Sequence, residues 1–437
     1  MKLTRRNFLK GSAAATASGL VSTPLAASPL SPSDHKALVV VFLFGGNDAF
    51  NTIIPLDRKY YRAYRRARRD LKIPKENVLN TTLKAGSRIK VGINDAMRPL
   101  MPHFRRGDAT VLLNSGQLIE PTRIQGIENN TVELPEFLMA HNLQQDMWQT
   151  GTSNFGSELG WAGRMLDRFT NTSAAPSLFS LFGENKLMRG ESVRQSVLKP
   201  EGVGTYPSWG QLDGASDGYF GHFMEEGYEN LYSRQYAKTM RDGVLENNFL
   251  NTALTDFPAS GNLPESRLGQ QLGMVERLIQ AREALGQNRQ VFFVGMGGFD
   301  THHDQASVHP VLLQELAESL SAFQNSLNDK GLSDSVTTIT MSEFGRRAQA
   351  NETGTDHGWG GHQIVLGGSV NGDRAYGRFP SLRPNSSLNY ENGRIIPTMA
   401  ADRVNASLCR WFGLPEDDIF KMFPNTRNFS RPYVDFI

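Results

Sequence analysis

This chain of 437 residues contains a single cysteine, Cys409. One thiol cannot form an internal disulfide, so the fold does not depend on an oxidising compartment. The surrounding sequence, Ser-Leu-Cys-Arg-Trp at 407–411, is typical of a helix that packs its thiol against a core. An apolar setting does not generate the thiolate that a cysteine nucleophile needs. The sequence therefore excludes a disulfide scaffold and argues against thiol catalysis.

The sequence also lacks an excess of charge of either sign. It contains 46 Lys and Arg residues against 44 Asp and Glu residues, a formal net charge of +2. The first 27 residues hold four basic residues and no acid, so their removal leaves a formal charge of −2. This balance gives no reason to expect a nucleic-acid partner. No tandem repeat is visible, and no glycine-rich loop is followed by Lys-Ser or Lys-Thr, which excludes a phosphate-binding P-loop.

No stretch near the N-terminus is long and apolar enough to form a stable membrane span. The Ala- and Ser-rich segment 11–27 is broken by Gly19 and Pro24. It follows Thr-Arg-Arg-Asn-Phe-Leu-Lys at 4–10, and paired arginines before a mildly apolar tract are typical of a twin-arginine (Tat) signal. We predict a Tat signal peptide at residues 1–27, cleaved near its end. The alternative is a basic N-terminal tail of a cytoplasmic protein.

A Tat signal predicts both a partner and a location for the protein. The partner is the Tat export machinery, and the location is periplasmic or secreted. Because this pathway carries folded cargo, a cofactor or metal is often inserted before export. The sequence predicts no stable membrane span in the mature chain.

The mature chain, about 410 residues, is long enough to bury a large core. Continuous apolar, β-branched runs indicate buried strands at 37–44, 109–114, 290–295, 336–341 and 363–367. Helical periodicity occupies 135–149, 268–286 and 310–330. This alternation predicts one α/β domain, 36–437, with a doubly wound, mostly parallel sheet sandwiched by helices. The segment 170–264 is richer in Gly, Ser and Asn, and we interpret it as an insertion or cap.

Acidic and histidine side chains cluster in the loops next to these predicted strands. The loops are Gly-Gly-Asn-Asp at 45–48, Asp-Thr-His-His-Asp at 300–304, Ser-Glu-Phe-Gly-Arg at 342–346 and Asp-His-Gly-Trp-Gly-Gly-His at 356–362. In open parallel sheets, ligands bind at the carboxyl ends of the strands. Carboxylates and imidazoles that converge there suit a divalent metal such as Zn, Mn or Mg. The sequence therefore predicts a metal site at this edge of the sheet.

Each of these residues also has a purely structural interpretation. Asp48 is placed to cap the following helix. His302 or His303 could be a surface loop residue, and Glu343 could form an ion pair with Arg346. The coincidence of acids or histidines in several loops favours a shared site over four independent structural roles.

Five segments resemble a known family in their order and spacing. They are GGNDAFNT (45–52), AHNLQQDMWQTG (140–151), GGFDTHHDQ (297–305), SEFGRRAQANETGTDHGWGGH (342–362) and PTMAADRVNASLCRWFGL (397–414). From about Leu38 to the C-terminus, the chain resembles the Tat-exported bacterial family called domain of unknown function 1501. That family is grouped with the alkaline phosphatase and sulfatase superfamily. The resemblance implies an alkaline phosphatase-like α/β/α sandwich and a hydrolytic centre with one or two metal ions.

The resemblance also assigns metal-site roles to seven residues: Asp48, Asp300, His302, Glu343, Asp356, His357 and His362. Asp48 matches the first-strand aspartate that binds metal throughout the superfamily. Asp300 and His302 match a later Asp/His pair, whose usual spacing is four positions and not two. Glu343 stands where an Asp-His pair is usual, and Phe344 replaces the second ligand. His357 resembles the last histidine ligand, whereas His362 could equally orient the substrate.

The resemblance places the nucleophile of the superfamily at the start of a helix. Many relatives have serine where this chain has Ala140. The attacking group is then Thr52, Ser115, Thr150 or a water molecule activated by the metal, or else no group attacks. His141 is a candidate for substrate binding or proton transfer, or else a helix-face histidine held by a backbone carbonyl. We take His141 and Thr52 as the predicted catalytic residues.

Two functions from different classes follow from these patterns. The first is a metal-dependent hydrolase that acts on a small phosphate or sulfate ester in the periplasm. The second is a non-catalytic exported protein that retains the fold for binding or assembly at the cell envelope.

A basic run at 58–69 belongs to neither function. Its sequence, Arg-Lys-Tyr-Tyr-Arg-Ala-Tyr-Arg-Arg-Ala-Arg-Arg, fits a solvated helix face over packed tyrosines. The alternative is a surface that binds polyanions or a membrane.

Overall fold

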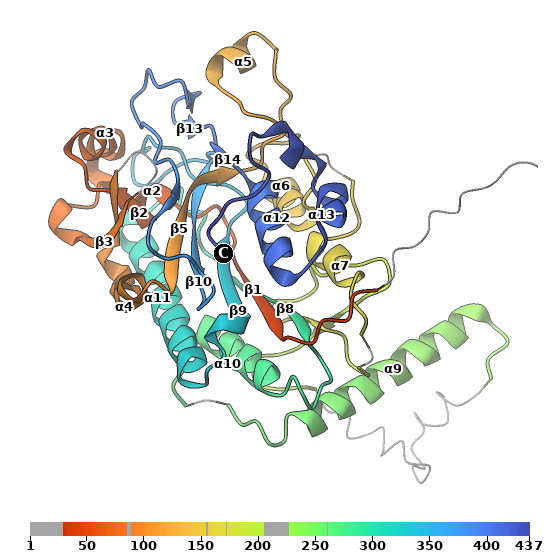
Figure 1. Cartoon of the computed structure of the whole chain (residues 1–437). Coiled ribbons are helices and arrows are strands. Elements are labelled where there is room, and N and C mark those ends of the chain that lie inside the picture. The colour runs from red at the N-terminus through yellow and green to blue at the C-terminus, as the bar shows by residue number, and fades with distance from the viewer. Residues whose placement is uncertain (1–28, 85–88, 154–155, 172, 205–226, 260) are drawn as a thin grey trace, which may run out of the picture.

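Nine strands form one central sheet in the part of the chain that the computed structural model describes, namely residues 29–84, 89–153, 156–171, 173–204, 227–259 and 261–437 (Figure 1). The predicted signal peptide, 1–27, lies outside the described residues. The strands are β1 (Lys36–Leu43), β5 (Ala109–Gly116), β6 (Leu178–Ser180), β7 (Gln195–Val197), β8 (Arg289–Met296), β9 (Val336–Met341), β10 (Gly361–Leu366), β11 (Tyr376–Gly377) and β14 (Met399–Ala400). Their order is β11-β5-β10-β9-β1-β8-β6-β7, and β14 also pairs with β5.

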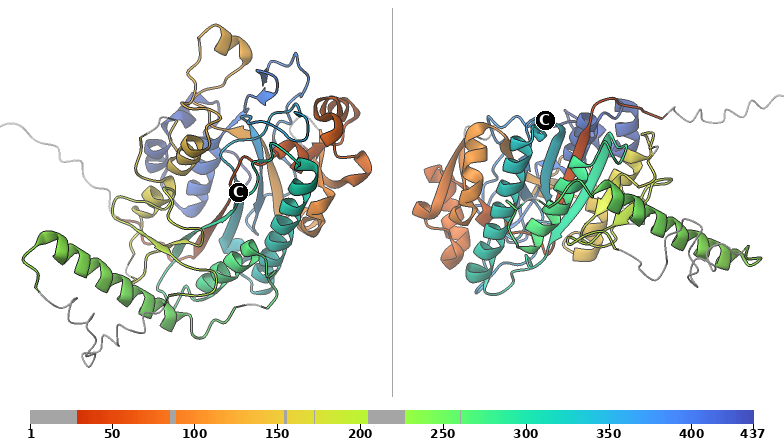
Figure 2. Two further views of the ribbon diagram at one scale, coloured as in Figure 1. Left: turned by 180° about the vertical axis from the view of Figure 1, so that it is seen from behind. Right: turned by 90° about the horizontal axis from the view of Figure 1, so that it is seen from below.

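The central strand β1 explains why the sheet is covered on both faces. Its residues from Ala37 to Leu43 are all buried, because side chains alternate between the two faces and each face packs against helices. One face packs against α10 (Arg267–Gln280) and α11 (Gln305–Asp329). The other packs against α7 (Trp161–Leu166), α12 (Ala401–Phe412) and α13 (Glu416–Met422). The prediction of an α/β fold with a large, mostly parallel sheet and flanking helices is confirmed (Figure 2).

Strand β10 departs from the parallel arrangement. It runs antiparallel to both of its neighbours, β5 and β9. The segment between β9 and β10 contains no helix, and strands joined without a crossover helix return antiparallel. The first residues of β10 consequently lie at the same edge of the sheet as the carboxyl ends of β1, β8 and β9.

The segment 170–264, interpreted from sequence as an insertion or cap, contributes two different kinds of element among its described residues. Strands β6 and β7 extend the central sheet beyond β8, in parallel register. Both have three residues, too short for a recognisable strand pattern. Helix α9 (Leu231–Ala253) instead projects from the side of the molecule (Figures 1 and 2).

Smaller elements surround the sheet. A second sheet contains β2 (Ile53–Pro55), β3 (Val78–Lys84) and β4 (Lys90–Asn94), and a hairpin contains β12 (Asn389–Tyr390) and β13 (Arg394–Ile395). The remaining α-helices are α2 (Ala49–Thr52), α3 (Arg58–Arg68), α4 (Met101–Arg106), α5 (Ile124–Glu128) and α6 (His141–Thr150). Short 3-10 turns occur at 69–71, 75–77, 95–100, 333–335 and 424–428. Among the described residues, no helix is long and apolar enough to cross a bilayer.

Helix α6 begins later than the sequence indicates. The helical pattern starts at residue 135, but the helix starts at His141. Phe137 and Met139 adopt positive φ angles of 48° and 69°, which no right-handed helix accommodates. The helix therefore points its first residue, His141, towards the loops at the carboxyl edge of the sheet.

Candidate metal centre

The loops that follow β1, β8 and β9 are held against one another by the backbone of Gly45. Its N–H donates to Glu343 Oε1 at 2.9 Å, and its φ is +116°. A Cβ atom at this position would lie 2.3 Å from the backbone nitrogen of Asp300. Only glycine allows this approach, so the first loop fixes the distance between the other two.

Three imidazole rings point their Nε2 atoms at one place next to these loops. The Nε2 atoms of His141 and His302 each lie 3.0 Å from Nε2 of His357. The carboxylate of Asp300 completes the group, with oxygen atoms 3.1–3.5 Å from the same three nitrogens. Ligand atoms about 2.1 Å from a tetrahedral zinc ion lie about 3.4 Å from one another. The ligand atoms of His141, Asp300 and His357 all lie within 4.8 Å of one another, a spacing that fits a single cation. His302 lies beside this group, next to His357 and Asp300.

The other nitrogen of each ring is held by a hydrogen-bond acceptor. Nδ1 of His141 lies 2.8 Å from Glu343 Oε1, and Nδ1 of His302 lies 3.3 Å from Asp356 Oδ1. Nδ1 of His357 lies 2.9 Å from the backbone oxygen of Met139, which can only accept. Carboxylate or carbonyl acceptors assign the proton to Nδ1 and leave the Nε2 lone pairs free. This is the arrangement of metal-binding histidines with their outer partners.

Phe344 fixes the rings from the side. Its ring centroid lies 4.8 Å from that of His141 and 4.7 Å from that of His357. Phe344 thus packs against two of the imidazoles.

Asp300 is anchored by a buried arginine and remains open to solvent. Arg346 Nη1 donates to Asp300 Oδ1 at 2.7 Å and to the backbone oxygen of Gly45 at 3.0 Å. The Arg346 side chain is fully buried, whereas that of Asp300 is 47% exposed. Burial acts to raise the pKa of Asp300, but the Arg346 hydrogen bond and charge outweigh it and lower the pKa. The carboxylate is therefore ionised and accessible from one side.

Two of the imidazoles next to Asp300 have opposite pKa shifts. The hydrogen bond to Glu343 raises the pKa of His141, against the effect of burial. Burial lowers the pKa of His357, and the positive charge of Arg346 adds to this effect. Glu343 is buried, which acts to raise its pKa, but hydrogen bonds from His141, Gln145 and backbone N–H groups lower it overall. Opposite shifts in adjacent groups are typical of functional sites.

Asp48 lies apart from the imidazole cluster in this structure. Its fully buried carboxylate accepts hydrogen bonds from Arg68 and Gln305 and caps α2 through the N–H groups of Phe50 and Asn51. The structural interpretation as a helix cap thus describes its observed contacts. Arg68 belongs to the basic run 58–69, and sequence patterns did not reveal this ion pair.

His362 and the candidate hydroxyl nucleophiles are also not brought to the cluster. Nδ1 of His362 accepts from the backbone N–H of Asn114, and burial lowers the pKa of the ring to about 3. Thr52 is buried and donates to the backbone oxygen of Asp48. Ser115 donates to Gln363, and the Thr150 hydroxyl bonds with that of Thr152. Cys409 is buried in the core, which raises its thiol pKa.

The predicted residues therefore separate into three groups. His141, Asp300 and His357 form one group with His302 beside it, and Glu343 and Asp356 hold the rings of His141 and His302. Asp48, Thr52 and His362 are buried elsewhere. The sequence suggested an ion pair between Arg346 and Glu343. In the structure, Arg346 instead forms its ion pair with Asp300. His303 is exposed and takes no part in the cluster.

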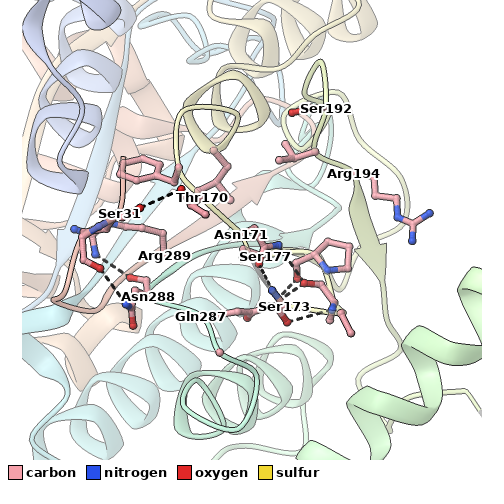
Figure 3. A pocket seen from close by; sticks show the side chains of 18 residues that line it. Ser31, Thr170, Asn171, Ser173, Ser177, Ser192, Arg194, Gln287, Asn288 and Arg289 are labelled. Atoms are coloured by element: carbon pink, nitrogen blue, oxygen red, sulfur yellow. Dashed lines mark hydrogen bonds between the residues drawn. The ribbon is translucent and has the colours of Figure 1, made fainter. Parts of the chain in front are cut away.

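A separate hollow of 520 Å³ lies where β8 begins, at the opposite edge of the sheet (Figure 3). Its polar groups are bound to the protein itself. Arg289 donates to the backbone oxygen of Phe412 and to Asp34, and Gln287 donates to the backbone oxygens of Ala175 and Pro176. This hollow holds no cluster of acids and histidines, and the candidate site is the imidazole cluster.

Fold and site define an α/β protein with a histidine- and carboxylate-rich centre at the carboxyl edge of its sheet. The family described as protein of unknown function (DUF1501) matches residues 35–404, and the chain belongs to this family. A Tat signal sequence matches residues 2–22, so the protein is exported through the Tat machinery to the periplasm or beyond. Among curated proteins, none matches the sequence.

Several solved structures have a distant likeness to this chain. The crystal structure of Ps i-CgsB is 9% identical over 91% of this chain and 78% of its own, with a TM-score of 0.39. The PsFucS1 sulfatase from Pseudoalteromonas sp. is 9% identical over 88% and 68%, with a TM-score of 0.31. BT1596, a 2-O GAG sulfatase, is 8% identical over 90% and 75%, with a TM-score of 0.31. Likeness at this level does not identify the fold or the function.

Proposed function

We propose that this protein is a metal-dependent hydrolase of phosphate or sulfate esters, exported with its metal bound, and that its fold is of the alkaline phosphatase and sulfatase type. The observation that carries the proposal is the grouping of two imidazole Nε2 atoms, those of His141 and His357, with the carboxylate of Asp300. The Nε2 atom of His302 lies beside them. Lone pairs that face one another repel unless a proton or a cation lies between them. The imidazole-rich donor set favours zinc, with manganese next, over magnesium.

Three residues would hold the metal, His141, Asp300 and His357, and His302 beside them is the candidate for a fourth ligand. A divalent cation there would supply positive charge to an anionic ester and would acidify a water molecule for attack. Hydrolysis adds the elements of water across the P–O or S–O bond and releases phosphate or sulfate and an alcohol. The exposed side of Asp300 leaves room for such a substrate.

The neighbouring residues of this chain orient the reaction. Arg346 holds Asp300 and contributes a fixed positive charge beside the site. Glu343 accepts from Nδ1 of His141, which fixes the ring and leaves its Nε2 atom to the metal. The positive end of α6 also points to this place, because His141 is its first residue.

Ala140 favours the second candidate function, a non-catalytic binding protein. It occupies the N-cap of α6, where a serine would place a hydroxyl next to the cluster, and it provides no side-chain hydrogen bond. A protein of this class would bind the metal and an anionic ligand without turnover.

Turnover of small esters tests the proposal. We expect the purified, metal-loaded mature protein to hydrolyse 4-nitrophenyl phosphate or 4-nitrophenyl sulfate, and His141→Ala to lose at least about a hundredfold in kcat/KM. His303→Ala, which changes the exposed neighbouring histidine, should retain wild-type turnover. Bound metal with no turnover of either ester would contradict the hydrolase proposal and favour the binding function.

A further inference from the structure

Helix α3 presents a row of exposed cations. The tyrosines are packed as the sequence indicates, since Tyr64 is buried and donates to Asn51 Oδ1. The opposite face of the helix and its C-terminal end carry six exposed basic side chains: Arg58, Lys59, Arg62, Arg65, Arg66 and Arg69. Within the described part of the chain, none of these six forms an ion pair. In a mature protein with a formal charge of −2, this is a strong local concentration of positive charge.

The cations line a groove. A hollow of 860 Å³ has Lys59, Arg62, Arg66 and Arg69 on one wall. The other wall is the segment 381–386, which contributes a fifth cation, Arg383, and the polar side chains of two serines and an asparagine. None of the lining residues is acidic or aromatic. Figure 1 shows α3 at the periphery, beside the loops that surround β13.

The groove, which we call the basic groove, borders the loop that shapes the imidazole cluster. Gln349 lines it, and the next residue, Ala350, donates its backbone N–H to the backbone oxygen of Ala67 on α3. Arg69 also lines a second hollow of 390 Å³, together with Asn351. The amide of Asn351 donates to Asp356, the residue that holds His302. Two adjoining hollows thus connect the row of cations to the loop behind the cluster.

We propose that the basic groove binds an anionic polysaccharide, and that the ester at the imidazole cluster is carried by a unit of the same polymer. This inference rests on the proposed function. From Lys59 to Arg69, the cations recur at helical spacing over about 15 Å, which suits charges repeated along an extended chain. The neutral hydroxyl and amide groups of the facing wall suit the hydroxyls of sugars.

Other polyanions fit the groove less well. Single-stranded nucleic acids are bound by stacking their bases on aromatic side chains, and the groove has none. A membrane surface calls for a flat or convex basic face with apolar side chains that insert between lipids, whereas these cations line a concavity. An exported protein also meets polysaccharides at the cell envelope.

Binding of dextran sulfate tests the inference. We expect the wild-type mature protein to bind dextran sulfate, but not uncharged dextran, with an affinity that falls as salt is added. The double variant Arg62→Glu/Arg66→Glu should bind at least about tenfold more weakly, since it replaces two attractions with two repulsions. The matched control is Arg98→Glu/Arg105→Glu, which makes the same charge change at exposed sites outside the groove. It should bind as the wild type does.

Three results would overturn the inference: equal binding by the groove variant and the wild type, an equal loss in the control variant, or binding of anionic phospholipid vesicles but not of dextran sulfate. Circular dichroism and melting temperature show whether each variant is folded, and Arg62→Gln/Arg66→Gln replaces the charge reversal if it is not. Binding is measured without turnover, so the two proposals fail separately. Groove-dependent binding without ester hydrolysis contradicts the hydrolase proposal and leaves the polysaccharide site in the groove standing.

Discussion

At the scale of single residues, histidines that are neighbours in sequence have different roles. His302 joins the cluster and His303 points to solvent, while His357 joins it and His362 is packed between Phe50 and Phe379. The sequence predicted that acids and histidines gather at this edge of the sheet. It could not show which ring nitrogen is free, because that depends on acceptors far away in sequence, such as Met139 for His357.

The outer carboxylate Asp356 provides a residue-scale prediction. Asp356→Asn removes the charge that orients His302 and stabilises its Nδ1 proton, but it leaves the four inner groups in place. We expect metal affinity to fall by about 10- to 100-fold without loss of the fold. Competition with a chelator of known affinity measures this change, and His303→Ala provides the control. Unchanged affinity in Asp356→Asn would show that the contact to His302 has no role in metal binding.

The buried ring of His362 predicts a pH dependence of stability. Burial lowers its pKa to about 3, from an ordinary value of 6.5. The unfolded chain therefore takes up a proton below pH 6.5 and the folded chain does not, so this contribution to stability is present above pH 6.5 and is lost as the pH falls towards 3. Between pH 7 and pH 5, the loss is about 2 kcal/mol.

His362→Gln isolates that contribution, because glutamine keeps an acceptor for the Asn114 N–H but does not titrate. Urea unfolding measures the unfolding free energy of each protein at pH 7 and at pH 5. The decrease from pH 7 to pH 5 should be smaller in the variant than in the wild type, by about 2 kcal/mol. An equal decrease in unfolding free energy from pH 7 to pH 5 in both proteins would mean that His362 is protonated in the folded state.

At the scale of elements, the long apolar runs predicted the central strands, whereas local pattern could not determine strand direction or edge strands. The runs at 37–44, 290–295 and 336–341 correspond to β1, β8 and β9. The antiparallel direction of β10 follows from its connection to β9, which lacks a helix. The late start of α6 follows from two positive φ angles that its sequence does not reveal. Both features shape the candidate site, since they bring His141 and the loop before β10 to the same edge.

The close approach of two loops at Gly45 gives an element-scale prediction. Gly45→Ala places a Cβ atom 2.3 Å from the Asp300 backbone nitrogen, at a φ of +116° that alanine resists. We expect it to lower the unfolding free energy by about 1–3 kcal/mol and to weaken metal binding, because Asp300 must move. Gly297→Ala is the control, since nothing lies within 4 Å of its added Cβ. Equal metal affinity in both variants would contradict the view that Gly45 positions the site.

At the scale of the whole molecule, the fold gathers groups from distant parts of the chain at one edge of the sheet. His141, Asp300 and His357 come from a helix and two loops more than 50 positions apart in sequence, and each is fixed by a partner from another segment. An unfolded chain cannot present these side chains together. Export by the Tat pathway, which carries folded proteins, is consistent with metal insertion before export.

The metal content of the purified mature protein tests the central claim most directly. Elemental mass spectrometry should find about one divalent ion per chain, with zinc or manganese as the candidates, in the wild type and in His303→Ala. His357→Ala, which removes the ring that contacts both other imidazoles, should be folded and metal-free. A folded wild-type protein without metal, or equal metal content in His357→Ala and the wild type, would contradict the account.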